Sequence, residues 1–279
     1  MDAKLRKELA IAACKIRMAV IEGTYNAKAG HPGGSLSIAD LLAYLYFVQM
    51  KVDPAEPKAA DRDRLVLSKG HAAPALYGAL ALKGFFPAEE IKRLRKTDAM
   101  LQGHPSMCCV PGVDMSTGSL GQGISAACGM ALSAKHSGDD YKVYTILGDG
   151  EIEEGQVWEA AMFAAHKKLN NLVAFVDCNG LQIDGTVDEV NSPKPVDAKF
   201  AAFGWNVEVI DGHDFDAIEG ALAKAFKNDK PTAIIMNTVK GKGVSFMENQ
   251  VSWHGSAPNA EQYGIAMNEL NTALAAMEG

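Results

Sequence analysis

Two short segments of the sequence combine side chains that can bind a metal ion with glycines that let a phosphate come close. The first is Gly148-Asp149-Gly150, and the second is Asn179-Gly180, which follows Asp149 by thirty residues. A carboxylate and a side-chain amide offer hard oxygen ligands, which suit Mg²⁺ or Ca²⁺ better than a soft transition metal. Glycine allows a diphosphate to approach the backbone, and the start of a following helix favours its negative charge. Because Gly-Asp-Gly alone is more often a tight turn, the surrounding elements decide between the two interpretations.

The segments around these residues are predicted to form strand, helix and strand. The apolar run 141–147 predicts a buried strand, 153–168 a helix, and 171–177 a second strand. Such a crossover unit has parallel strands. Their carboxyl ends lie at the same edge of the sheet, where open α/β sheets bind ligands. We therefore predict that Asp149 and Asn179 lie side by side in a ligand site.

The rest of the sequence predicts one α/β domain over 1–279. An amphipathic helix opens the chain, because Leu5, Leu9, Ile16 and Val20 recur at helical spacing. Further strands are expected over 64–68, 205–210 and 232–238, and helices over 41–50, 72–83, 124–136 and 216–227, with a short helix from 261 onward. Together these elements predict an α/β fold with a central, mostly parallel sheet of about five or six strands and helices on both faces.

Glycines, proline and polar residues mark the expected loops. The segments 23–34 and 241–259 are predicted to be loops, and 185–199 a surface excursion. Ser37 with Asp40 resembles a capping box before the helix over 41–50.

Composition excludes several classes of function. The chain has 279 residues, 48% of them hydrophobic and 22% charged, and a formal net charge of −7. This charge argues against a nucleic-acid partner, and the basic cluster Lys92, Arg93, Arg95 and Lys96 is expected to be the solvated face of a short helix. No apolar stretch is long enough to span a bilayer, and the N-terminus has no apolar signal core. Five cysteines without zinc spacing favour reduced thiols in a cytoplasmic protein.

The pattern Gly148-Asp149-Gly150-x₃-Glu154-Gly155 followed by Asn179 resembles the motif of enzymes that use thiamine diphosphate. Further blocks narrow the resemblance to the transketolase family and stand in the order seen there: Gly30-His31-Pro32-Gly33-Gly34, Ser68-Lys69-Gly70-His71, Gly103-His104-Pro105, Thr117 to Gly123, and His254-Gly255. The resemblance covers nearly the whole chain, from about residue 6 to the 250s. Five ordered blocks are far more specific than any one of them.

The resemblance implies thiamine diphosphate with Mg²⁺, or Ca²⁺, as cofactors. Asp149, Asn179 and the backbone carbonyl of Leu181 would hold the metal ion, and the Leu181 side chain is expected in the core. Gly148 and Gly150 would lie against the diphosphate. The backbone of Gly118, Ser119 and Leu120 would contact the aminopyrimidine ring; transketolases commonly have proline at the position of Ser119.

Four histidines fall on positions that line the cofactor and the donor sugar in the family. His71 and His254 are expected near the diphosphate and the reacting centre, and His31 and His104 near sugar hydroxyls. An imidazole titrates near neutrality and can move protons there. Glu154 matches a residue of a hydrogen-bonded relay at the subunit interface. Outside these positions, His213 is expected in a turn, and His136 and His166 are expected on helices, as surface or packing residues.

The activity implied is transfer of a two-carbon ketol unit from a ketose phosphate such as xylulose 5-phosphate to an aldose phosphate, as in the pentose phosphate pathway. The family also needs pyrimidine-binding and C-terminal domains, which supply a glutamate for the aminopyrimidine and arginines for the sugar phosphate. Only twenty-five residues follow His254, so these domains are expected on a separate subunit, in an α₂β₂ assembly. The alternatives are a 1-deoxyxylulose-5-phosphate synthase-like enzyme, a split transketolase for an unusual sugar, and a non-catalytic cofactor-binding subunit.

Overall fold

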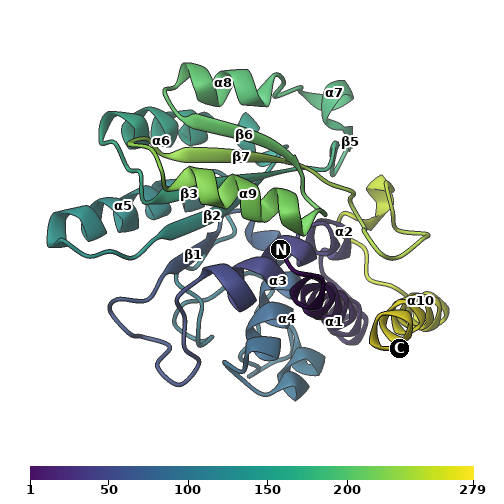
Figure 1. The fold of residues 1–279 in the computed structure, drawn as a ribbon. Coiled ribbons are helices and arrows are strands. Elements are labelled where there is room, and N and C mark those ends of the chain that lie inside the picture. The colour runs from purple at the N-terminus through teal and green to yellow at the C-terminus, as the bar shows by residue number, and fades with distance from the viewer.

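The computed structural model describes residues 1–279 and contains a five-stranded, all-parallel sheet (Figure 1). The strands lie in the order β1 (Arg64–Leu67), β2 (Val143–Gly148), β3 (Leu172–Cys178), β7 (Thr232–Asn237) and β6 (Asn206–Asp211). All five were expected from the sequence, and the predicted α/β fold class is confirmed.

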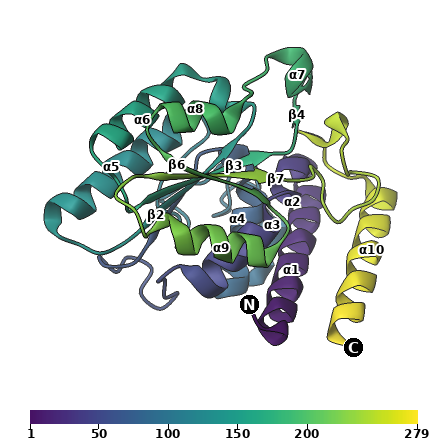
Figure 2. The ribbon, with the colours of Figure 1, turned by 45° about the horizontal axis from the view of Figure 1, so that its top comes forward.

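Helices cover both faces of this sheet (Figure 2). One face carries α1 (Ala3–Ala27), α3 (Ala39–Tyr44), α4 (Ala73–Lys83) and α9 (Phe215–Ala225), and the other carries α5 (Gln122–Ser137), α6 (Gly155–His166) and α8 (Val196–Ala202). Side chains alternate along the strands, so that Tyr144 and Phe175 pack in the first core while Leu147 and Val176 pack in the second. The sheet is therefore buried on both sides.

The C-terminal helix α10 (Ala260–Glu278) lies beside α1 in both views (Figures 1 and 2). The rings of Tyr25 and Tyr263 stack with centroids 4.2 Å apart. At 19 residues, α10 is longer than the short helix predicted, because the apolar side chains of Ala266 and Leu270 are buried against the rest of the domain.

Two local predictions near the N-terminus are wrong. The expected loop over 23–34 is much shorter, because α1 continues to Ala27 and α2 begins at Pro32 (Pro32–Leu36). Ser37 forms no capping box: the N-cap of α3 is Ile38, and the Ser37 hydroxyl donates instead to the buried carboxylate of Asp177 at 2.8 Å. Beyond α3 the chain continues as the π-helix η1 (Leu45–Gln49).

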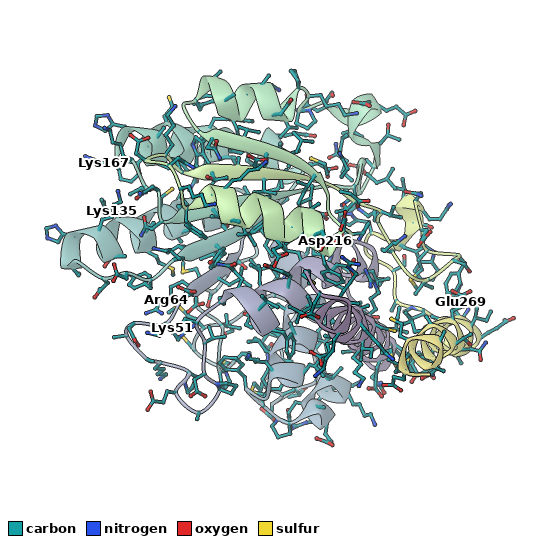
Figure 3. All side chains as sticks on the ribbon, viewed as in Figure 1. Lys51, Arg64, Lys135, Lys167, Asp216 and Glu269 are labelled. Atoms are coloured by element: carbon teal, nitrogen blue, oxygen red, sulfur yellow. The ribbon has the colours of Figure 1, made fainter.

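Short elements connect the main ones. They are the 3₁₀ helices η2 (Gly70–Ala72), η3 (Ala88–Arg93), η4 (Glu151–Glu153) and η5 (Val251–Trp253), the antiparallel pair β4 (Leu181–Gln182) and β5 (Gly185–Thr186), and α7 (Val187–Val190). None of the helices is both long and apolar enough to cross a bilayer. Charged side chains such as Lys51, Lys135 and Glu269 lie around the outside of the domain (Figure 3). Asp216 at the start of α9 pairs with the Met1 amino group at 3.2 Å.

Candidate functional site

A cavity of about 300 Å³ opens beyond the carboxyl ends of β2 and β3. Most of the residues proposed from the sequence line it, together with several that were not. The lining consists of His31, Gly34, Lys69, His71, Gly118, Leu120, Gly148, Asp149, Gly150, Glu151, Asn179, Leu181, Gln182, Ile183, Lys240 and His254. The site therefore joins segments that lie far apart in the sequence.

Asp149 lies where β2 ends, next to the end of β3. Its backbone N–H donates to the Asp177 carbonyl at 3.3 Å, and its carboxylate accepts hydrogen bonds from the N–H groups of Gly150 at 3.0 Å and Gly180 at 2.6 Å. The side chain is buried and has no ion-pair partner. Burial, and then the charge of Asp177, raise the pKa of Asp149 to about 6. A buried carboxylate without a counter-charge is suited to a bound cation.

Asn179 and Leu181 present two further oxygens on the same loop. The Asn179 amide donates to Asp177 at 2.8 Å, which fixes its orientation, and its oxygen accepts from the Leu181 N–H at 3.2 Å. The Leu181 carbonyl accepts from Lys240 Nζ at 2.9 Å. Together with Asp149 these are the hard oxygen donors that Mg²⁺ or Ca²⁺ requires. The Leu181 side chain is not in the core as expected: it is half-buried and lines the cavity.

Two buried lysines, which the sequence reasoning missed, bring positive charge to the cavity. Lys69 Nζ donates to Asp177 at 2.5 Å and to the Gly34 carbonyl at 2.7 Å. Lys240 is only 2% exposed, and its Nζ contacts the Leu181 carbonyl and His254 Nδ1 but no carboxylate. Burial, and then the charge of Lys69, lower the pKa of Lys240 to about 8. An ammonium group buried without a carboxylate fits the phosphates of a bound cofactor.

Asp177 organises this side of the cavity. Its fully buried carboxylate accepts hydrogen bonds from Lys69, Ser37, Asn179 and Thr238. Burial acts to raise the pKa of Asp177, but the Lys69 charge and these hydrogen bonds outweigh burial and lower it. Asp177 was predicted only as the last residue of a strand, because three of its four partners, Ser37, Lys69 and Thr238, come from distant segments.

Glu151 is a second buried carboxylate that the sequence did not single out. It accepts hydrogen bonds from the Ser68 hydroxyl and from the N–H groups of Gly121 at 2.9 Å and Gly148 at 3.0 Å. Burial raises its pKa. These bonds tie the ends of β1 and β2 to the start of α5, so Glu151 holds three walls of the cavity in register.

The four histidines proposed from the sequence form one cluster. The His31 ring lies at its centre, with centroid distances of 5.2 Å to His71, 5.6 Å to His254 and 6.3 Å to His104. Burial is the first cause that lowers all four pKa values, to about 4 for His31 and about 3 for His254. The imidazoles are therefore neutral at pH 7, and His31 Nδ1 is buried without a hydrogen-bond partner.

Three of the proposed site residues do not line the cavity. His104 lies against one wall, because a Cβ atom at Gly118 would come within 3.3 Å of its ring. Ser119 is next to the lining residues Gly118 and Leu120. Glu154 is exposed as the N-cap of α6, so its carboxylate is outside the cavity.

His213 does more than occupy a turn. Its Nδ1 lies 2.7 Å from the Asp40 carboxylate, and its Nε2 accepts from the Val239 N–H at 2.9 Å. Asp40 in turn pairs with Arg17. This network lies behind the segment that carries Lys240. His136 and His166 are exposed, which decides for the surface over a packing role. All five cysteines are free thiols.

Comparison with known proteins identifies the family of the chain. Residues 8–272 match the family model described as transketolase, thiamine diphosphate binding domain. The chain is 50% identical over 256 residues to the 6-deoxy-6-sulfo-D-fructose transketolase subunit SqwG of Clostridium sp. (strain MSTE9), covering 91% of this chain and 93% of that protein. It is 44% identical over 265 residues to one subunit of the apulose-4-phosphate transketolase of Phocaeicola vulgatus, covering 95% of this chain and 94% of that protein.

A solved structure agrees with this assignment. The crystal structure of transketolase from Campylobacter jejuni superposes with a TM-score of 0.90 at 32% identity, over 99% of this chain but only 46% of that one. The chain thus spans less than half of that transketolase, whereas it spans almost the whole length of the two subunits. The chain belongs to the transketolase family and corresponds to its N-terminal, thiamine diphosphate-binding domain, as fits the N-terminal subunit of a split transketolase.

Proposed function

We propose that this chain is the diphosphate-binding subunit of a transketolase that acts on a specialised sugar. The observation that carries the proposal is that one cavity holds both the buried carboxylate of Asp149 and the buried ammonium group of Lys240, and that Lys240 contacts no carboxylate. The Asp149 carboxylate suits a cation and the Lys240 ammonium group suits a phosphate, so together they match a metal-bound diphosphate.

The cofactor would be held by residues from both sides of the cavity. Asp149, Asn179 and the Leu181 carbonyl would hold Mg²⁺, while Lys240 and the backbone of Gly148 and Gly150 would face the diphosphate. The backbone of Gly118, Ser119 and Leu120 would face the aminopyrimidine. When bound, thiamine diphosphate supplies the electron sink for breaking and making the carbon–carbon bond beside a carbonyl group.

The histidine cluster would orient the sugar and move its protons. A neutral imidazole accepts a hydrogen bond at one ring nitrogen while it donates from the other. His31 Nδ1 has no partner within the chain, which supports a hydroxyl of the sugar as its partner. His104 would contact a second hydroxyl, and His71 and His254 would lie nearer to the reacting carbon. Support for these roles comes from the neutral imidazoles of His31, His71 and His254 in the cavity lining and from His104 against its wall.

We further propose that catalysis requires a partner subunit with the pyrimidine-binding and C-terminal domains, in an α₂β₂ assembly. Two relatives that match the chain almost end to end are themselves named as subunits, which supports this arrangement. Leu120 and Ile183 line the cavity while 37% and 62% exposed. Exposed apolar side chains at the mouth of a polar cavity are typical of a protein–protein contact, here with a partner subunit that would cover the cavity. Glu154, exposed nearby, would then lie at the interface.

The names of the relatives favour an unusual ketose over xylulose 5-phosphate. One is named for 6-deoxy-6-sulfo-D-fructose and the other for apulose 4-phosphate. Since the first shares 50% identity with this chain, we propose a sulfonated or phosphorylated ketose as the donor. The test is product analysis by mass spectrometry, in which the assembled complex receives each of these ketoses and xylulose 5-phosphate with an aldose phosphate acceptor. Preferred turnover of xylulose 5-phosphate would contradict the specialised substrate.

A further inference from the structure

Arg95 differs from the basic residues around it. Lys92 and Arg93, at the end of η3, pair with Glu22 at 3.6 Å and Glu90 at 3.1 Å, as expected for a solvated face. The Arg95 guanidinium makes no hydrogen bond and no ion pair anywhere in the chain. An arginine without a partner is free to bind a ligand without first losing a contact.

The backbone holds Arg95 in an uncommon conformation. Its φ angle is 59°, in the left-handed region that residues other than glycine seldom adopt. Its N–H donates to the Leu101 carbonyl at 2.8 Å, which closes the loop between the two residues. Such conformations persist where surrounding structure enforces them, and they concentrate at functional sites.

This loop lays the Arg95 side chain against the backbone of Gly103. A Cβ atom at Gly103 would lie 2.6 Å from Cζ, 2.7 Å from Nη2 and 2.8 Å from Nε of Arg95. The guanidinium therefore lies against the segment that continues directly into His104, in the space that a side chain at position 103 would occupy.

The same position brings Arg95 to the edge of the histidine cluster. Gly103 precedes His104, whose ring centroid lies 6.3 Å from that of His31. After burial, the charge of Arg95 is the next cause that lowers the pKa of both His31 and His104. Arg95 itself is exposed, so it stands outside the histidines, toward solvent.

Resting on the transketolase function above, we propose that Arg95 binds the terminal anionic group of the sugar substrate. A guanidinium presents paired N–H donors that match two oxygens of a phosphate or a sulfonate. The reacting end of the sugar would lie among His31, His71 and His254, and the charged end would extend past His104 to Arg95. The specificity for an anionic sugar would then be set in part by this chain and not only by its partner subunit.

The test compares Arg95→Gln with Arg95→Lys and, as matched control, Arg93→Gln, each in the assembled complex. The donors are 6-deoxy-6-sulfofructose, fructose 6-phosphate and the neutral ketose L-erythrulose. Loss of a hydrogen bond to a charged group should raise KM for both anionic donors by about 10- to 100-fold in Arg95→Gln. Arg95→Lys should have an intermediate KM, because lysine keeps the positive charge but lacks the paired N–H donors of a guanidinium. KM for L-erythrulose and kcat should change little.

Two outcomes would overturn the proposal: an equal rise in KM for L-erythrulose, which indicates a structural role, or unchanged KM values for the anionic donors. A rise in KM for one anionic donor alone would support the proposal and show which anion Arg95 binds.

A wild-type complex that transfers no two-carbon unit would refute the function and not the anion site. Phenylglyoxal modification followed by mass spectrometry then tests Arg95 without turnover. Inorganic phosphate should protect Arg95 but not Arg93, and equal modification of both would contradict the inference.

Discussion

The carboxylate of Asp149 accepts a hydrogen bond of 2.6 Å from the backbone N–H of Gly180, the residue that follows Asn179. This bond joins the loop after β2 to the loop after β3 and brings two prospective metal ligands to one edge of the sheet. It also leaves the carboxylate buried without a cation in contact. The site is therefore organised before any ligand binds, which reduces the ordering cost of binding.

Replacement of Asp149 tests the metal site. Asp149→Ala removes the only carboxylate of the proposed ligand set, so metal-dependent binding of thiamine diphosphate should be lost. Isothermal titration calorimetry with Mg²⁺ measures this, with the exposed Asp184→Ala in the following loop as control. Undiminished affinity in Asp149→Ala would refute the assignment.

Replacement of Asp177 tests the buried ion pair. Asp177→Ala leaves Lys69 buried without its carboxylate, which should destabilise the fold by about 3–5 kcal/mol. Urea denaturation measures this loss, and the exposed Asp197→Ala should unfold like the wild type. A double variant Lys69→Met, Asp177→Leu should recover part of the stability, because no unpaired charge remains. An equal or larger loss in the double variant would argue against charge burial as the cause.

Two glycines of α5 should respond in opposite directions to a methyl group. A Cβ atom at Gly123 would lie 2.6 Å from the Ser68 Cα atom, so Gly123→Ala should destabilise the chain by about 1–3 kcal/mol. At Gly129 a Cβ atom meets nothing within 4 Å, and alanine there should stabilise the helix by about 0.5–1 kcal/mol. Thermal unfolding of both variants separates the two cases, and equal effects would show that the packing of α5 on β1 is misplaced.

The histidine cluster predicts a dependence of stability on pH. The pKa of His31 is lowered from 6.5 to about 4, so the unfolded chain binds a proton in this range that the folded chain does not. The stabilising contribution is complete above pH 6.5 and is lost as the pH falls toward 4. In His31→Gln the free energy of unfolding should therefore fall less steeply over this range than in the wild type. Urea denaturation at several pH values tests this, and the exposed His136→Gln should follow the wild-type curve.

Much of the fold could be predicted because its signals are local. The strands around Asp149 and Asn179 are short apolar runs that end at glycines, and parallel pairing then places both residues at one edge. The four site histidines could be proposed because they stand in motifs that resemble those of transketolases; a neighbouring glycine alone would also have marked His213.

The residues that hold the site together could not be found in this way. Asp177, Glu151 and Lys240 obtain their roles from hydrogen bonds to segments far away in the sequence. Lys69 stands within a block that carried the family resemblance, yet its partner Asp177 is more than a hundred residues away. Arg95 was grouped with its solvated neighbours because nothing in the sequence shows that its loop turns it onto Gly103.

The most direct test of the central claim is a two-carbon transfer assay with thiamine diphosphate and Mg²⁺, using 6-deoxy-6-sulfofructose as donor and an aldose phosphate as acceptor. It is run with this chain alone, with only its C-terminal partner, and with both. We predict transfer only in the mixture, because under the proposed function the cavity of this chain would supply only the diphosphate half of a site shared with a partner subunit. Full activity of this chain alone would contradict that account, as would a cofactor-loaded complex that transfers no two-carbon unit from any ketose.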